Sequence, residues 1–289
     1  MEKIIKEKIS SLLSQEEEVL SVEQLGGMTN QNYLVQTSSN QYIVKFFGKG
    51  TEKLIDRQNE KFNLELLKDL KLDVENYLFD IEAGIKVNQY IENAETFDST
   101  IIKTKFEKIA PILQTIHASG KELRGEFAPF EEIKKYESLI QGEISYPNYE
   151  VVRKSVFSLK EELEQIGVDK KSCHIDLVPE NFIEGLDGHL YLIDWEYSSM
   201  NDPMWDLAAL FLESEFTSAE EEDFLSHYES DKTPVSREKI RIYKILQDII
   251  WSLWTIYKEE NGADFGDYGI SRYNRAVKEL DFKGGSHEN

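Results

Sequence analysis

The periodicity of the hydrophobic residues changes once along this chain, near residues 91–97, and this change restricts the possible folds more than any other feature. Upstream, short segments rich in β-branched and aromatic residues alternate with glycine, serine and asparagine turns, which is typical of antiparallel strands. Downstream, apolar residues recur at the spacing of amphipathic helices. The pattern predicts an α+β protein with two lobes, a small β-rich N-terminal lobe (residues 1–92) and a larger, mostly helical C-terminal lobe (residues 93–289).

The N-terminal lobe is predicted to contain a five-stranded sheet and one long helix. Residues 2–13 carry isoleucine and leucine at helical spacing, which predicts an amphipathic helix that packs on something larger. The long helix is expected at residues 52–70. The strands are expected at residues 19–25, 32–36, 41–47, 77–81 and 85–91.

The C-terminal lobe is predicted to be a set of helices with one interruption at residues 171–197. In the interruption, a loop with Pro179 is followed by two short strands around the turn at residues 185–188. The helices are expected at residues 99–116, 130–139, 149–166, 205–213, 218–228, 236–258 and 268–280.

Composition restricts the partners of this protein. The 289 residues include 55 acidic residues and 33 lysines and arginines, which gives a net charge of −22. A field of this sign disfavours nucleic acid and anionic membranes, and it raises the local concentration of cationic small molecules and divalent metals. Hydrophobic residues at 40% supply enough apolar surface for a buried core, so wholesale disorder is excluded.

The cysteine content and the apolar runs indicate the compartment. The single cysteine, Cys173, excludes an intrachain disulfide and a cysteine-based zinc site. The first residues carry charges where a signal peptide needs an apolar core, and apolar runs such as residues 207–212 are far shorter than the ~20 residues of a spanning helix. We therefore expect a soluble cytoplasmic protein without membrane insertion, in an oligomeric state that the sequence leaves open.

The densest cluster of polar residues lies in the interruption. His174, Asp176 and Asn181 form a His-x-Asp-x₄-Asn pattern, and Asp194 follows on a predicted strand. Phosphoryl transfer needs a carboxylate that orients the attacking hydroxyl and accepts its proton, and hard oxygen ligands that hold Mg²⁺. Asp176 fits the first requirement, and Asn181 with Asp194 fits the second. The alternative is a polar loop in which Asp176 caps a turn.

Two features of the N-terminal lobe agree with phosphoryl transfer. Lys45 is a lone lysine in an apolar strand, and Glu60 on the long helix offers a carboxylate to hold its ammonium. The glycine-led turn at residues 25–32 is suited to closing backbone amides over phosphates. Each feature alone is weak, because strand lysines are more often solvated and most such turns are only hairpins.

The order of these motifs resembles the protein-kinase-like fold, in its branch of choline, ethanolamine and aminoglycoside kinases. The overlap covers nearly the whole chain. The chain is most similar to bacterial choline kinases of the pathway that decorates cell-surface glycopolymers with phosphocholine. Residues 173–182 and 192–199 look like the two signature segments of that family, and residues 201–208 follow them.

This resemblance implies ATP and Mg²⁺ as cofactors and a role for each matched residue. Asp176 is the implied catalytic base, Asn181 and Asp194 the metal ligands, and His174 and Asp206 the residues that brace the catalytic loop. Lys45 is expected to contact the ATP phosphates and to pair with Glu60. The residues expected to contact the nucleotide are Gly26, Gly27, Thr29, Asn30, Lys45, Glu60, Gln89, Tyr90, Ile91 and Ile193.

An aromatic stripe indicates the acceptor. Trp251, Trp254 and Tyr257 recur every three residues on one predicted helix, a spacing that core packing also explains. The resemblance assigns aromatic walls for choline at Tyr197, Trp251 and Trp254 and an acidic contact at Glu213, with Tyr257 and Tyr268 as further walls. Aromatic faces hold a quaternary ammonium by cation–π attraction, worth about 2 kcal/mol or more per desolvated contact.

Together these observations predict an ATP-dependent choline kinase that forms phosphocholine. Only eleven residues separate Asp194 from Asp206, which leaves no space for an activation segment and disfavours a protein substrate. One rival is an ethanolamine or aminoglycoside kinase, whose primary ammonium would leave N–H donors without acceptors in an aromatic box. The other is a non-catalytic kinase-like binding module, which the presence of Lys45, Asp176 and Asp194 disfavours.

Overall fold

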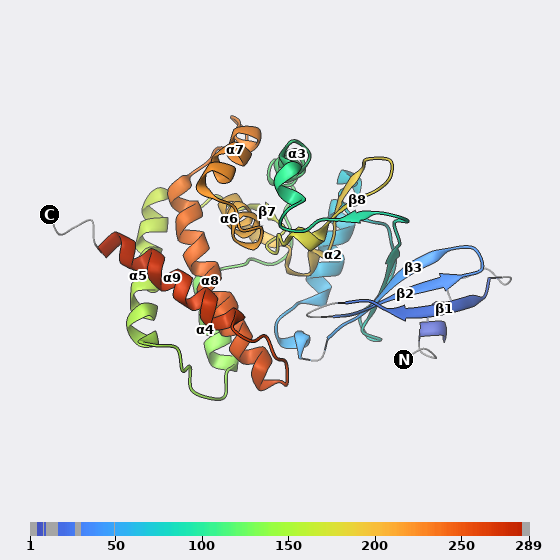
Figure 1. Cartoon of the computed structure of the whole chain (residues 1–289), viewed down its shortest axis with the longest axis horizontal. Coiled ribbons are helices and arrows are strands. Elements are labelled where there is room, and N and C mark those ends of the chain that lie inside the picture. Colours follow the sequence, from blue (N-terminus) through green and yellow to red (C-terminus); the bar gives the residue numbers. More distant parts are fainter. Residues whose placement is uncertain (1–4, 8, 10–16, 27–29, 49, 285–289) are drawn as a thin grey trace. The chain divides into compact units, whose positions relative to one another are not determined.

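The computed structural model describes residues 5–7, 9, 17–26, 30–48 and 50–284, with the side chains of residues 281–284 left out. The chain divides into two compact units (Figure 1). The first comprises Met1–Phe97 and Glu180–Glu196, and the second comprises Asp98–Pro179 and Tyr197–Asn289. The functional division into residues 1–92 and 93–289 stays a prediction.

A five-stranded antiparallel sheet forms the first unit, in the strand order β1-β2-β3-β5-β4 (Figure 1). It confirms the five predicted strands to within a few residues at each end. The strands are β1 (Val19–Gln24), β2 (Gln31–Thr37), β3 (Gln41–Phe46), β4 (Asn76–Asp80) and β5 (Ile85–Gln89).

The two faces of this sheet carry different residues, because successive strand residues point to opposite sides. One face is apolar and packs with Ile5 and Ile9, the two buried positions described in the predicted N-terminal helix; most of that helix lies outside the described residues. Lys45 on β3 and Lys86 on β5 are register partners on the opposite face. The buried apolar set is Ile5, Ile9, Tyr33, Val35, Tyr42, Val44, Ile85 and Val87.

The helix predicted at residues 52–70 is divided in the structure. A 3₁₀ turn at Thr51–Lys53 precedes α2 (Arg57–Leu67), and a second 3₁₀ turn follows at Lys68–Leu70. The α-helix begins at Arg57 because the Asp56 side chain accepts hydrogen bonds from the backbone N–H groups of Gln58 and Asn59, at 2.9 and 3.1 Å.

A second sheet in the first unit carries the segment that precedes Asp194. Its strands are β6 (Glu95–Thr96), β8 (Phe182–Glu184) and β9 (Leu190–Leu192), in the order β6-β8-β9. The hairpin of β8 and β9 was predicted, whereas the two-residue β6 is too short to give a period-two signal.

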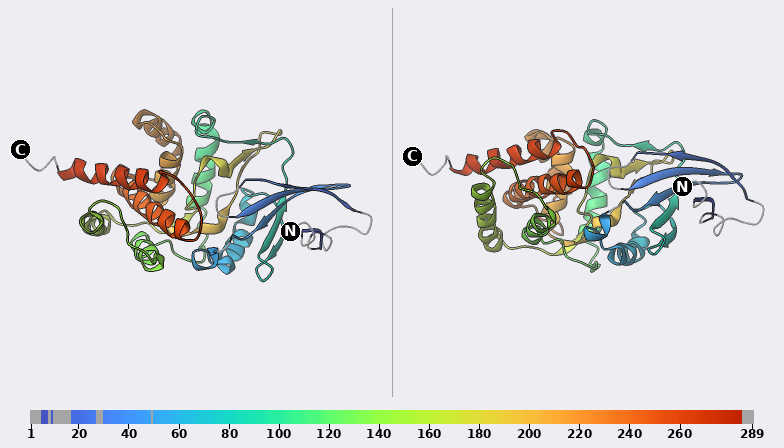
Figure 2. Two further views of the ribbon diagram at one scale, coloured as in Figure 1. Left: turned by 60° about the horizontal axis from the view of Figure 1, so that its bottom comes forward. Right: turned by 90° about the horizontal axis from the view of Figure 1, so that it is seen from below.

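The second unit is helical, as predicted. Its longest helix, α8, packs against α4, α5, α6 and α9, and Figure 2 shows α8 and α9 side by side. The short strands β7 (Lys171–Cys173) and β10 (Ser199–Asn201), which the sequence did not indicate, pair with each other. The helices are α3 (Phe106–His117), α4 (Pro129–Leu139), α5 (Tyr149–Ile166), α6 (Pro203–Glu213), α7 (Ser218–Tyr228), α8 (Arg237–Glu260) and α9 (Tyr268–Gly284).

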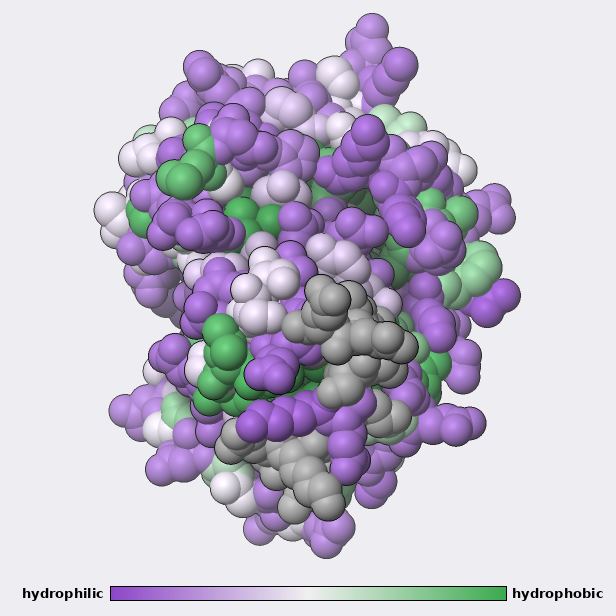
Figure 3. Space-filling view, turned by 90° about the vertical axis from the view of Figure 1, so that its right-hand side faces the viewer, coloured by the Kyte–Doolittle hydropathy of each residue, from purple (hydrophilic) through white to green (hydrophobic). Residues whose placement is uncertain are grey.

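The surface agrees with the charged composition. Hydrophilic side chains cover most of the face seen in Figure 3, and hydrophobic side chains show between them in smaller groups. Within the part of the chain that the structure describes, no helix combines the length and the apolarity that a membrane span requires.

Candidate active site

A buried ion pair joins β3 to the segment after β9. The Nζ atom of Lys45 donates a hydrogen bond to Oδ1 of Asp194 at 2.6 Å. Burial alone would lower the pKa of Lys45, but the charges of Asp194 and Glu196 outweigh it and raise the pKa above its ordinary value. The ammonium therefore stays charged. Asp194 has a φ of 67°, a left-handed backbone that is uncommon for a residue with a Cβ atom.

The expected pair between Lys45 and Glu60 is wrong. Glu60 accepts hydrogen bonds from Nζ of Lys86 at 3.1 Å and from Nη1 of Arg57 at 2.6 Å. The strand register explains the exchange, because it sets Lys86 beside Lys45 on the face that carries both lysines. Glu60 therefore forms its ion pair with Lys86, and Lys45 forms one with Asp194 instead.

A second carboxylate, Glu196, connects this ion pair to the glycine turn. Its Oε2 atom accepts hydrogen bonds from Nδ2 of Asn30 and from Nη1 of Arg57, both at 2.8 Å. Burial and the charge of Asp194 raise the pKa of Glu196. Oδ1 of Asn30 in turn accepts from the backbone N–H of Gly48 at 3.3 Å, so the turn, α2 and the segment after Asp194 form one network.

The structure describes all but two of the other residues expected at the nucleotide, and those it describes lie in the same unit. Gly26 accepts a hydrogen bond from Nδ2 of Asn32 at 3.0 Å, whereas Gly27 and Thr29 lie outside the described residues. Gln89 ends β5, where its backbone N–H donates to the carbonyl of Glu75 at 2.8 Å. Tyr90 and Ile91 follow it and are half-buried.

One backbone hydrogen bond relates the two expected metal ligands. The N–H of Ile193 donates to the carbonyl of Asn181 at 2.9 Å. Ile193 directly precedes Asp194, so this bond brings the backbones that carry Asn181 and Asp194 next to each other.

In the second unit, α6 fixes the backbone beside Asp176. Ile175 has a φ of 79°, which is a strained conformation for a β-branched residue and costs about 1–3 kcal/mol. The Asp206 carboxylate accepts hydrogen bonds from the backbone N–H groups of His174 and Ile175, both at 2.8 Å. Nε1 of Trp205 donates to the carbonyl of Ile175 at 3.0 Å. These three bonds hold the loop in the conformation that presents Asp176.

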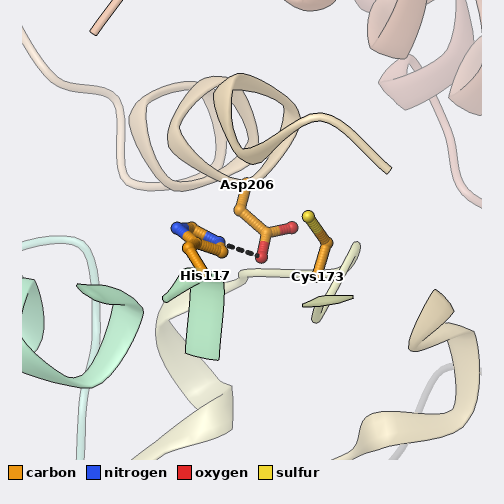
Figure 4. A group of neighbouring side chains, drawn as sticks. All are labelled: His117, Cys173 and Asp206. Atoms are coloured by element: carbon orange, nitrogen blue, oxygen red, sulfur yellow. Dashed lines mark hydrogen bonds and ion pairs between the residues drawn. The ribbon is translucent and has the colours of Figure 1, made fainter. Parts of the chain in front are cut away.

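His117, Cys173 and Asp206 lie together in the second unit (Figure 4). Nε2 of His117 is 3.0 Å from Oδ2 of Asp206, and Nδ1 is 2.7 Å from the Tyr228 hydroxyl. Burial raises the pKa of the Cys173 thiol well above its ordinary value, so the sulfur stays protonated. Because the histidine nitrogens and the carboxylate oxygens already have partners, this group is a packing element and does not suit a metal ion.

Five aromatic rings follow one another from the segment before β10 across α8 to the start of α9. We call them the aromatic group: Tyr197, Trp251, Trp254, Phe265 and Tyr268. The Trp251 ring lies 5.8 Å from Tyr197 and 6.4 Å from Trp254 between centroids, in nearly perpendicular orientations. Phe265 lies 4.9 Å from Trp254 and 6.4 Å from Tyr268. Nε1 of Trp254 is buried and has no hydrogen-bond partner among the described residues.

Asp176 acts electrostatically on this aromatic group. Burial is the main cause of the raised pKa of Tyr268, and the negative charge of Asp176 adds to it. Burial and then the charge of Glu132 raise the pKa of Tyr136, which is hydrogen-bonded to Tyr197, and Asp176 and Tyr257 add smaller contributions. The expected base therefore acts on Tyr268, one of the expected walls of the acceptor pocket, within the same unit.

The choline/ethanolamine kinase family model matches residues 22–277 of this chain. The chain belongs to the choline/ethanolamine kinase family. Its sequence is 80% identical to that of choline kinase LicA from Streptococcus pneumoniae. It matches the crystal structure of that protein with a TM-score of 0.94 over 98% of this chain and 99% of that chain. It is 81% identical to a structure of LicA in complex with AMP, with a TM-score of 0.92 over 97% and 98%. Protein LicA of Haemophilus influenzae is 31% identical over 266 residues, which are 88% of this chain and 99% of the relative. These similarities confirm the predicted family and its kinase-like α+β fold.

The side-chain oxygens of Asn181 and Asp194 fit Mg²⁺. The Asp194 carboxylate and the Asn181 amide carbonyl are hard ligands of the kind that Mg²⁺ prefers. The ammonium of Lys45 lies 2.6 Å from Oδ1 of Asp194, so this carboxylate is already placed to hold a cation.

The acidic residue expected to contact the acceptor has a partner that the sequence did not indicate. In this kinase Glu213, at the end of α6, forms an ion pair with Arg272 on α9. The Arg272 guanidinium also lies 4.7 Å from the Tyr268 ring centroid. The spacing of Tyr268 and Arg272, four residues apart on one helix face, is the signal that would have found this arginine.

Proposed function

We propose that this protein is a choline kinase that transfers the γ-phosphate of ATP to the hydroxyl of choline, with phosphocholine and ADP as products. The observation that carries the proposal is an aromatic group on which the charge of Asp176 acts, at Tyr268. Aromatic faces can bind the cationic head of an amino alcohol, and a carboxylate can accept the proton of its hydroxyl. Membership of the choline/ethanolamine kinase family and the similarity to choline kinase LicA support the same reaction.

For the nucleotide we propose the first unit. The AMP complex of LicA supports ATP as the phosphate donor. Lys45, freed from Asp194, would contact the phosphates, and the turn at Gly26, Gly27, Thr29 and Asn30 would cover them. Asn181 and Asp194 would hold Mg²⁺, which when bound neutralises charge on the phosphates. Gln89, Tyr90, Ile91 and Ile193 would line the nucleotide, and Glu60 would position the face that carries the lysines.

For the chemistry we propose Asp176 as the base. Its carboxylate would orient the choline hydroxyl and accept its proton while the hydroxyl oxygen bonds to the γ-phosphorus and the bond to ADP breaks. His174 and Asp206 would position the loop, a role that is supported by the bonds from the backbone N–H groups of His174 and Ile175 to Asp206.

For the acceptor we propose the aromatic group as the ammonium site. Tyr197, Trp251 and Trp254 would present their faces to the trimethylammonium head, and Tyr257 and Tyr268 would extend the walls. Glu213 would supply a negative field. A quaternary ammonium has no N–H to donate, so rings without acceptors suit it better than they suit ethanolamine.

The proposed product, phosphocholine, is the substrate of a further reaction. We infer that phosphocholine made in the cytoplasm, where ATP is available, feeds the decoration of cell-surface glycopolymers. Disrupting the gene should then remove phosphocholine from the cell surface, which an antibody to phosphocholine detects on intact cells.

An ADP-release assay with choline, ethanolamine and an aminoglycoside in parallel tests the proposed reaction. We expect the highest kcat/KM with choline and a product that co-migrates with phosphocholine. If ethanolamine were turned over as well as choline or better, choline would not be the preferred substrate and the proposed reaction would be wrong. No ADP release with any of the three would return the protein to the class of kinase-like binding modules.

A further inference from the structure

Four charged side chains form a cluster on α6, α8 and α9, next to the aromatic group. Arg272 is 4% exposed and contributes Nη1 to Oδ1 of Asp248 at 3.1 Å and Nη2 to the carboxylate of Glu213. Arg275 donates from Nε and Nη2 to the two oxygens of Asp248, both at 2.6 Å. Two acidic and two basic groups therefore compensate one another, and Arg272 alone bridges both carboxylates.

This cluster is continuous with the rings proposed to hold the ammonium. The Arg272 guanidinium stacks 4.7 Å from the centroid of Tyr268, the last ring of the aromatic group. Asp248 precedes Trp251 by one helical turn on α8. The charges of Glu213 and Asp176 both raise the pKa of the Tyr268 phenol.

A carboxylate that can accept hydrogen bonds, such as Glu213, matters to a primary ammonium group but not to a quaternary one. Protonated ethanolamine carries three N–H donors, and burying them without acceptors is unfavourable. A free carboxylate would accept at least one of them in a charge-assisted hydrogen bond. Choline gains nothing comparable from such an acceptor, because its methyl groups contact ring faces and sense only the overall field.

We propose that Arg272 is a specificity-determining residue, which favours choline over ethanolamine by occupying the carboxylate of Glu213. The guanidinium takes up the hydrogen-bond acceptor that a primary ammonium requires. It leaves Glu213 a weakened negative field that acts on any small cation regardless of methylation. The aromatic faces then decide the affinity. This inference rests on the proposed function and deepens it, since it assigns the choice among amino alcohols to an arginine outside the ring set.

The test measures kcat/KM of the full-length protein at saturating ATP for a series of acceptors. Choline, dimethylethanolamine, methylethanolamine and ethanolamine carry zero to three N–H donors when protonated. In Arg272→Gln we expect the ratio of kcat/KM for choline to that for ethanolamine to fall about tenfold or more, in steps along the series. The ratio is independent of the fraction of folded enzyme. The matched control is Arg275→Gln, which removes the other arginine on Asp248 without touching Glu213 and should keep the ratio within about twofold.

A second variant keeps the proposal falsifiable if Arg272→Gln does not fold. Glu213→Gln should raise the KM of all four acceptors by a similar factor, because the cluster, with two arginines and only Asp248, then carries a net positive charge beside each of them. A KM that rises mainly for ethanolamine would mean that Glu213 already accepts its N–H groups, and would overturn the proposal. An unchanged ratio in folded Arg272→Gln would also overturn it, whereas wild-type protein that turns over no choline would refute the proposed function instead.

Discussion

Lys45 and Asp194 are 149 residues apart in the chain, yet their charged atoms meet at 2.6 Å. The lysine ammonium compensates a carboxylate that the proposed reaction needs for Mg²⁺. In the proposed reaction, Asp194 would exchange the lysine for the metal, and Lys45 would contact a phosphate instead.

The first prediction concerns the metal ligands. Asp194→Ala should remove activity with both Mg²⁺ and Mn²⁺, because it deletes the anionic ligand. Asn181→Ala deletes a neutral ligand and should retain some activity that higher metal concentration partly restores. Metal titrations of both variants beside wild type provide the measurement. Equal rescue of the two variants would show that Asp194 is not the principal ligand.

The second prediction concerns the base. Asp176→Asn should lower kcat about 10²-fold or more and leave ATP binding nearly unchanged, because it removes proton acceptance without removing a nucleotide contact. Steady-state kinetics and nucleotide binding by calorimetry measure the two effects. Turnover above about a tenth of wild type would contradict the assignment of Asp176 as the base.

The third prediction separates the two lysines of the sheet. Lys86 is 1% exposed and holds Glu60, so Lys86→Met leaves a buried carboxylate with Arg57 alone and should cost about 3 kcal/mol of unfolding free energy. Lys45→Met should raise the KM for ATP much more and cost less stability, since Asp194 is 27% exposed. Denaturant unfolding and ATP titrations of both variants check this. The reverse pattern would mean that Lys86 is the phosphate contact.

The fourth prediction concerns pH. Burial raises the pKa of Asp73 to about 6, from an ordinary value of 3.8, while Lys86 opposes the shift. The folded protein therefore holds this proton more tightly than the unfolded chain does. The unfolding free energy should fall as the pH rises from 3.8 to about 6 and level off above that, by at most about 3 kcal/mol in total.

Asp73→Asn isolates this effect, because the amide cannot ionise. In metal-free buffer the variant should melt above wild type at pH 7.5, and the difference should shrink toward pH 5. A difference in Tm that is the same at both pH values would assign the effect to packing or hydrogen bonding and not to the charge.

Local signals predicted the elements of this fold better than its ion pairs. The periodicity of hydrophobic residues located the strands and helices, and Asp56 before α2 could have placed the start of that helix at Arg57. The strands β6, β7 and β10 span two or three residues each, which is too short for any period. Motif spacing likewise singled out Asp176, Asn181 and Asp194, whose roles stay predictions.

The charged partners were missed because they depend on contacts that are distant in sequence. Glu60 was expected to bind Lys45, but the register of β3 and β5, which the sequence does not encode locally, sets Lys86 beside it. Arg57 meets Glu196 across 139 residues and Arg272 meets Glu213 across 59. Such pairs leave no periodic pattern, so only the folded arrangement identifies them.

The last prediction tests whether Trp251 and Trp254 contact the substrate or only stabilise the core. Both are buried, at 8% and 6% exposed, and both lie in the aromatic group. If they face the ammonium, choline should change the tryptophan fluorescence saturably, and each Trp→Ala variant should raise the KM for choline far more than the KM for ATP. Replacement by Phe keeps a π face and should cost less than Ala.

Core packing predicts a different combination of results for the same variants. Both alanine variants would then lose about 3–5 kcal/mol of stability, as buried tryptophans do, and the folded fraction would bind choline normally. Thermal melts beside the kinetics separate the two cases, with Phe as the matched control at each position. A Trp254→Ala protein that melts lower and keeps the wild-type KM for choline would place this ring in the core.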